Sequence, residues 1–149
     1  MMLKFFNKNT NQNNKKNDSL IKIVSLLIHA AKIDENYTDK EKKLIRDFVA
    51  DYTIEKKEII SQDGIFNILK KAEDYENNSN QILEFTKEVK KMELKLKMEI
   101  LKTLWKIVLS DEKSGIYESN LMRRICGLLY IPDKLSGEIK SSILNGRNK

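Results

Sequence analysis

Apolar side chains recur every three or four positions through most of the chain from residue 20 onward. The first such run is Leu20, Ile23, Val24, Leu27, Ile28 and Ala31. This spacing places the apolar residues on one face of an α-helix. Glycine occurs five times and proline once in 149 residues, so few residues interrupt helices of this kind. No convincing pair of β-strands remains, and we predict an all-α fold.

Capping signals divide the first half of the chain into separate helices. Thr38 and Glu41 have the spacing of a capping box, which predicts a second helix from Thr38 to near Tyr52. Thr53 is well placed to start a shorter helix that runs to Ile60. We therefore expect three separate helices between residues 20 and 60.

The remaining boundaries are marked by glycine, by polar stretches and by the one proline. Gly64 is expected to precede a new apolar run, and residues 74–80 are predicted to form a polar loop. Two further apolar runs meet near residues 90–93, where a break is expected. Pro132 is suited to the first turn of a last helix.

Composition predicts one folded domain, over residues 18–149, after a tail over residues 1–17. The Asn/Lys-rich segment 7–17 has no apolar residue to bury, and we expect the tail to be disordered. The apolar residues before it are too few for a signal peptide or a membrane span. The domain has enough residues to form a single hydrophobic core.

Charge and cysteine content favour a cytoplasmic protein. The net charge is +6, lysine greatly outnumbers arginine, and the lysines are interleaved with glutamates, which is typical of a solvated surface. No specific nucleic-acid partner is expected. Cys126 is the only cysteine, so no intramolecular disulfide can form, and its apolar neighbours predict a buried position.

An internal repeat becomes visible when the sequence is shifted by 77 positions. Residues 27–35 then lie over residues 104–112, and each segment is an apolar run that ends in an acidic pair. The next helices also correspond, because Glu41 and Leu44 lie over Glu118 and Leu121. The chain is therefore predicted to consist of two pseudo-symmetric halves, and each half contains a helix, an acidic loop and a second helix.

Over roughly residues 20–145 these features resemble the TerB family, which is associated with tellurite resistance. Asp34 with Glu41, and Asp111 with Glu118, occupy the places of the family's acidic residues. The segment 123–132 resembles the family's closing segment. The same fold type occurs at the N-terminus of DjlA-type co-chaperones, whose J-domain His-Pro-Asp motif is absent here. The resemblance implies a TerB-like helical domain of about seven helices, and a non-enzymatic interaction or scaffold module in a stress or tellurite/metal response.

The four acidic residues have two interpretations. Asp34, Glu41, Asp111 and Glu118 could converge as oxygen ligands of Ca²⁺ or Mg²⁺. Alternatively, Glu41 completes a capping box and Glu118 interacts favourably with the N-terminal end of its helix, and no ion is needed. An EF-hand is excluded because its twelfth position is Ile45 or Met122. We favour capping and expect no cofactor.

No catalytic arrangement is recognisable in the sequence, so we expect a protein that is not an enzyme. His29 is expected to be a partly buried or surface imidazole, and one histidine with one cysteine cannot make a zinc site. We expect a protein partner. Two alternatives remain: a divalent-cation-binding regulatory domain, and a membrane-peripheral accessory protein whose N-terminal Leu3, Phe5 and Phe6 bind a lipid surface weakly.

Overall fold

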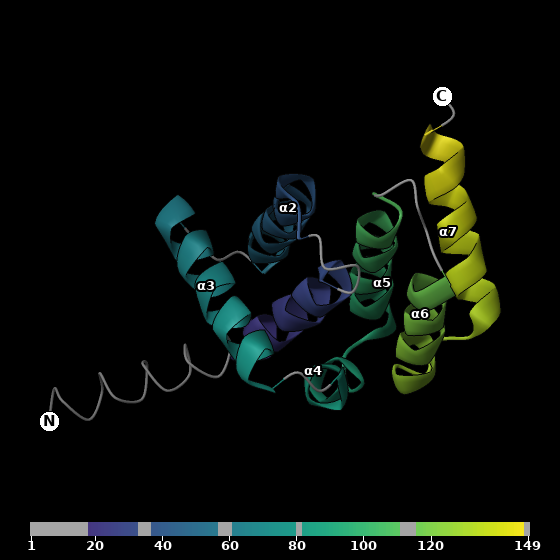
Figure 1. The fold of residues 1–149 in the computed structure, drawn as a ribbon, viewed down its shortest axis with the longest axis horizontal. Coiled ribbons are helices and arrows are strands. Elements are labelled where there is room, and N and C mark those ends of the chain that lie inside the picture. Colours follow the sequence, from purple (N-terminus) through teal and green to yellow (C-terminus); the bar gives the residue numbers. More distant parts are fainter. Residues whose placement is uncertain (1–17, 33–36, 57–60, 80–81, 111–115, 148–149) are drawn as a thin grey trace, which may run out of the picture.

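The computed structural model describes residues 18–32, 37–56, 61–79, 82–110 and 116–147. Within these ranges the chain forms seven α-helices and no strand, which confirms the predicted all-α fold (Figure 1). A first helix over residues 18–31 is followed by α2 (Asp39–Glu55), α3 (Gln62–Ser79), α4 (Ile82–Val89), α5 (Leu94–Val108), α6 (Ile116–Leu128) and α7 (Asp133–Arg147). The predicted tail, residues 1–17, lies outside the described ranges.

The first helix lies among α2, α3, α4 and α5, and helices α6 and α7 lie beyond α5 (Figure 1). Helix α5 packs against α2, α6 and α7, while α2 also contacts α3, and α4 contacts α6. Helix α7 therefore lies at the outer edge, against α5 and α6. This arrangement places both faces of the first helix among neighbouring helices.

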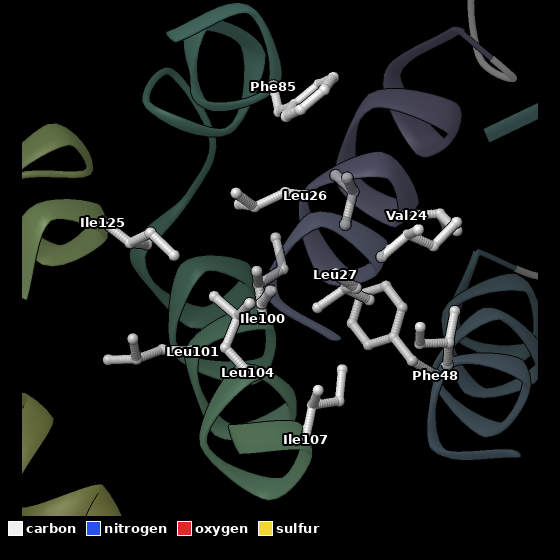
Figure 2. Packing of buried hydrophobic residues seen from close by; sticks show 14 of the residues in the cluster. Val24, Leu26, Leu27, Phe48, Phe85, Ile100, Leu101, Leu104, Ile107 and Ile125 are labelled. Atoms are coloured by element: carbon white, nitrogen blue, oxygen red, sulfur yellow. The ribbon is translucent and has the colours of Figure 1, made fainter. Parts of the chain in front are cut away.

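The hydrophobic core is built around the first helix and α5. Leu27 points toward Phe48 of α2 and toward Leu104 of α5 (Figure 2). Phe85 of α4 packs against His29 of the first helix. Leu27, Leu104 and Phe85 are completely buried. Burying each such side chain stabilises the fold by about 1.5–3 kcal/mol. The apolar stripes seen in the sequence therefore meet in one continuous core.

Helix α2 is longer than predicted at its C-terminal end. The expected new helix at Thr53 is wrong, because α2 continues to Glu55. The Thr53 hydroxyl donates a hydrogen bond to the Ala50 carbonyl at 2.9 Å, so its side chain is satisfied inside the helix. Residues 57–60, where the shorter helix was expected to end, lie outside the described residues.

Helix α3 begins earlier and ends later than predicted. Gly64 lies in its first turn, where its N–H donates to the Ser61 hydroxyl at 3.1 Å, as expected for an N-cap. The loop predicted over residues 74–80 is also wrong, because α3 continues to Ser79. Contacts of this last turn with the first helix stabilise it, and they are described below.

Two later boundaries agree with the sequence. The chain turns between α4 and α5, where Lys91 and Met92 donate backbone hydrogen bonds to Glu88 and Val89. Pro132 directly precedes α7, and its carbonyl accepts from the Ser136 N–H at 3.2 Å. The proline therefore lies at the start of the helix, where its missing N–H leaves no internal hydrogen bond unmade.

Candidate functional site

The capping box predicted at the start of α2 is present. Thr38 is the N-cap, and its hydroxyl oxygen accepts from the Glu41 N–H at 3.3 Å. Oε1 of Glu41 accepts from the Thr38 N–H at 3.2 Å and from the Thr38 hydroxyl at 2.8 Å. Glu41 is almost fully buried. This carboxylate therefore has a local structural role in closing the first turn of α2.

Of the four predicted acidic residues, only Glu41 has a side chain within the described part of the structure. Asp34 and Asp111 lie outside the described residues, and Glu118 is placed in α6 by its backbone alone. Within the described part of the chain, no three histidine, cysteine, aspartate or glutamate side chains cluster closely enough to hold a metal ion. The cation site stays a prediction, and the capping role of Glu41 is observed.

A hollow of about 410 Å³ lies between α2 and α3, close to the Glu41 cap. Its aromatic walls are Tyr37 and Phe66. Phe66 is 65% exposed, which is unusual for a side chain of this size. Charged side chains complete the lining: Asp39, Lys42, Arg46, Lys70 and Glu73. The hollow thus combines exposed apolar surface with a small excess of positive charge.

Tyr37 is held in this hollow as a neutral phenol. Burial raises the pKa of Tyr37 well above its ordinary value, and the nearby Glu73 carboxylate raises it further by its charge and by a hydrogen bond. The Lys42 ammonium lies 4.9 Å from the ring centroid. The Tyr37 side chain therefore contacts both a carboxylate and a cation, which restrict its movement in the wall of the hollow.

A buried carboxylate joins the first helix to α3. Glu76 is only 5% exposed, and its two oxygens lie 3.3 Å from His29 Nδ1 and 2.9 Å from Lys32 Nζ. Lys32 also donates to Asn77 at 3.0 Å. These contacts explain why α3 extends through residues 74–79. One feature of the sequence indicated this longer helix: the three- and four-residue spacing continues after Ala72 to Tyr75 and Glu76.

His29 and Cys126 have packing roles, as their sequence contexts indicated. His29 is partly buried, and its ring centroid lies 5.7 Å from that of Phe85. Cys126 is buried, and burial raises the pKa of its thiol, although a hydrogen bond with Ser136 acts in the opposite direction. A buried thiol with a raised pKa is a poor nucleophile at neutral pH.

The comparisons with known proteins agree with the helical architecture. A family model, described as tellurite resistance protein TerB, matches residues 20–141. No curated protein and no solved structure matches the chain. In the described part of the chain, no helix has both the length and the apolar character to cross a bilayer. Because the model match covers most of the sequence, the chain belongs to the tellurite resistance protein TerB family.

Proposed function

We propose that this TerB-family chain is a non-enzymatic interaction module, which acts in the cytoplasm as part of a stress response or a response to tellurite or metal. The observation that carries the proposal is the hollow beside α2 and α3, where Phe66 is exposed next to Tyr37. An aromatic side chain held in water has unfavourable contacts until a partner covers it. When a partner protein covers the exposed aromatic side chain, these contacts with water are lost, and the free energy released favours binding.

The chemistry of the hollow favours binding over catalysis. Its polar groups are three cations, two carboxylates and the Tyr37 phenol, and no serine, threonine or cysteine lines it to act as a nucleophile. Aromatic side chains and arginine are enriched in protein interfaces, and both occur here in Tyr37, Phe66 and Arg46. The partner surface that fits is therefore an apolar side chain with neighbouring polar or acidic groups.

Affinity capture from the native host tests this proposal. The chain is used as bait in its wild-type form, as Phe66→Ser, and as the matched control Leu83→Ser. Leu83 is 56% exposed on α4 and does not line the hollow, so its loss removes similar apolar surface elsewhere. We expect Phe66→Ser to lose partners that the other two baits retain. An identical set of captured proteins for all three baits contradicts the role of the hollow.

The stress role has a separate test in the native host. A strain that lacks the chain should grow worse than the wild type in the presence of tellurite, and the Leu83→Ser form should restore growth. The Phe66→Ser form should restore it poorly, provided that circular dichroism shows the same helix content and unfolding temperature for both variants. Equal growth of the deletion strain and the wild type argues against a tellurite response.

We also infer that the module consists of two related halves. On the inner faces, two pairs of positions 77 residues apart have the same burial: Leu27 and Leu104 are fully buried, as are Ile45 and Met122. This similarity supports the proposed repeat of a helix, an acidic loop and a helix. We expect residues 20–52 and 97–130 to superpose as helical hairpins in an experimental structure. Different interhelical angles in the two hairpins would contradict the proposed repeat.

A further inference from the structure

The C-terminus of α6 has an unusual residue at a position that favours glycine. The Ile131 N–H donates to the Cys126 carbonyl at 2.9 Å, and the Tyr130 N–H donates to the Gly127 carbonyl at 3.3 Å. This pair of bonds is the Schellman motif, whose residue after the helix adopts a left-handed backbone. That residue is Tyr130, with φ of 58°. A β-carbon is strained in this conformation, and glycine is not.

The strain at Tyr130 is not offset by burial of its side chain. The residue is 69% exposed, and its ring faces the Lys90 ammonium, which lies 4.9 Å from the ring centroid. Gly127, in the preceding turn, is a second locally unfavourable residue, because glycine is a poor helix former and a β-carbon here would meet nothing within 4 Å. Departures from local preference without a structural gain indicate a role in function.

The surroundings of Tyr130 are positively charged. Lys97 donates from Nζ to the Leu129 carbonyl at 3.2 Å, which places a second cation at the same end of α6. Arg123 is exposed on α6, seven residues before Tyr130 in the sequence. Among the described residues, no carboxylate forms an ion pair with these three cations.

A second exposed apolar side chain, Leu94, lies near Lys90 and Lys97 in the sequence. Leu94 is 59% exposed at the start of α5, one helical turn before Lys97 and on the same side of the helix. Helix α6 contacts both α4 and α5, and the end of α6 lies beside α4 (Figure 1). Three helices therefore present Tyr130 and Leu94 together with unpaired cations.

We propose that Tyr130, Leu94, Lys90, Lys97 and Arg123 form a docking surface, the Tyr130 surface, for an acidic segment of a partner protein that also contributes an apolar side chain. This surface is separate from the hollow between α2 and α3. Its three cations match carboxylates, and the exposed tyrosine is the kind of rigid aromatic side chain that dominates binding at interfaces.

An acidic protein segment fits this surface better than a lipid bilayer does. Binding to a membrane surface requires a broad apolar face in addition to cations. Here the exposed apolar side chains are Tyr130 and Leu94, and both lie at helix ends. Lys90 lies over the Tyr130 ring, and Lys97 contacts the carbonyl of the residue before it. A segment with one apolar residue between carboxylates therefore places its charges near cations and its apolar side chain on the aromatic ring.

The test uses the full chain and a fluorescent peptide of alternating glutamate and leucine, with binding measured by anisotropy. Tyr130→Gly removes the ring and leaves the net charge unchanged. We expect it to weaken peptide binding by about tenfold or more. It should also raise the unfolding temperature by about 2–4 °C, because the left-handed backbone is no longer strained. Tyr130→Phe should bind nearly as the wild type does.

Charge variants and chemical shifts locate the site. Lys90→Gln should weaken binding, whereas Lys102→Gln, an exposed lysine on α5 outside the Tyr130 surface, should not. Added salt should also weaken binding, and a glutamine–leucine peptide should not bind. The proposal is overturned by equal affinity of Tyr130→Gly and the wild type, by amide shifts that map away from α6, or by binding to anionic vesicles without binding to the peptide.

Discussion

The first helix and α5 have the same apolar stripe but different surroundings. Both present buried residues at three- and four-residue spacing, and the two stripes meet in the core (Figure 2). In the first helix, however, six consecutive residues, 23–28, are buried, which covers its whole circumference. In α5, one face stays in water and carries Lys95, Glu99, Lys102 and Lys106.

Helices α3 and α4 account for this difference, because they cover the outer side of the first helix. The buried Ser25 hydroxyl lies 2.7 Å from the Ile21 carbonyl and 3.2 Å from the Ala72 carbonyl of α3. Glu76 of the same helix binds His29, and Phe85 of α4 packs on that histidine. Polar groups on a fully covered helix need such partners, since an unsatisfied buried polar group is destabilising.

The largest expected effect compares matched positions on the two helices. Leu26 is fully buried, whereas Thr103, 77 positions later, is only half-buried. Leu26→Ala should lower the free energy of unfolding by about 2–5 kcal/mol, because it leaves a cavity. Thr103→Ala should change it by less than about 0.5 kcal/mol. Both are measured by urea denaturation, and equal losses would show that the outer sides of the two helices are covered alike.

A smaller effect is expected from ion pairs in the two surroundings. Glu76→Gln leaves His29 and Lys32 without a buried carboxylate partner and should lower the free energy of unfolding by about 1–3 kcal/mol. The control is Glu55→Gln, which breaks the pair with Lys95, 3.4 Å apart with both side chains exposed. Surface pairs contribute little, so the control should stay within about 0.5 kcal/mol of the wild type. A control as damaging as Glu76→Gln contradicts the comparison.

The comparison extends to helix ends, where the expected effect is smaller again. Helix α2, after the first helix, has the Thr38 cap, whereas the N-cap of α5, Glu93, makes no side-chain capping bond. Thr38→Ala should lower the free energy of unfolding by about 1 kcal/mol. Thr38→Ser keeps a capping hydroxyl, so its free energy of unfolding should stay close to that of the wild type. Thermal and urea unfolding measure the change. If alanine is as stable as serine, the cap does not stabilise α2.

Divalent cations are expected to leave the unfolding temperature unchanged. Adding them tests the role of the acidic residues that follow the first helix and α5 in the sequence. Asp34 follows the first helix and Asp111 follows α5. If the acidic residues act in local capping, millimolar Ca²⁺ or Mg²⁺ should leave the unfolding temperature unchanged. A rise that occurs in the wild type but is lost in Asp34→Asn and in Asp111→Asn would instead establish one shared cation site by mass action.

Local sequence signals were sufficient for several features that depend on neighbouring residues, although the helix start predicted at Thr53 was wrong. The Thr38-to-Glu41 spacing predicted the capping box, and the three- and four-residue spacing predicted which faces enter the core. The break near residues 90–93 and the position of Pro132 were also predictable. Each of these depends on backbone groups or side chains within about one helical turn.

Other features depended on contacts that no local pattern contains. The polar residues 74–79 resemble a loop, yet Glu76 stays helical because His29 and Lys32, more than forty positions earlier, meet its carboxylate. Tyr130 gives no sign of a left-handed backbone, and the hollow at Phe66 requires α2 and α3 to lie together. Helical spacing is a property of the chain itself, so the sequence determined the helices and their inner faces. Which outer faces are covered depends on the packing of distant helices, and only the tertiary structure decided that.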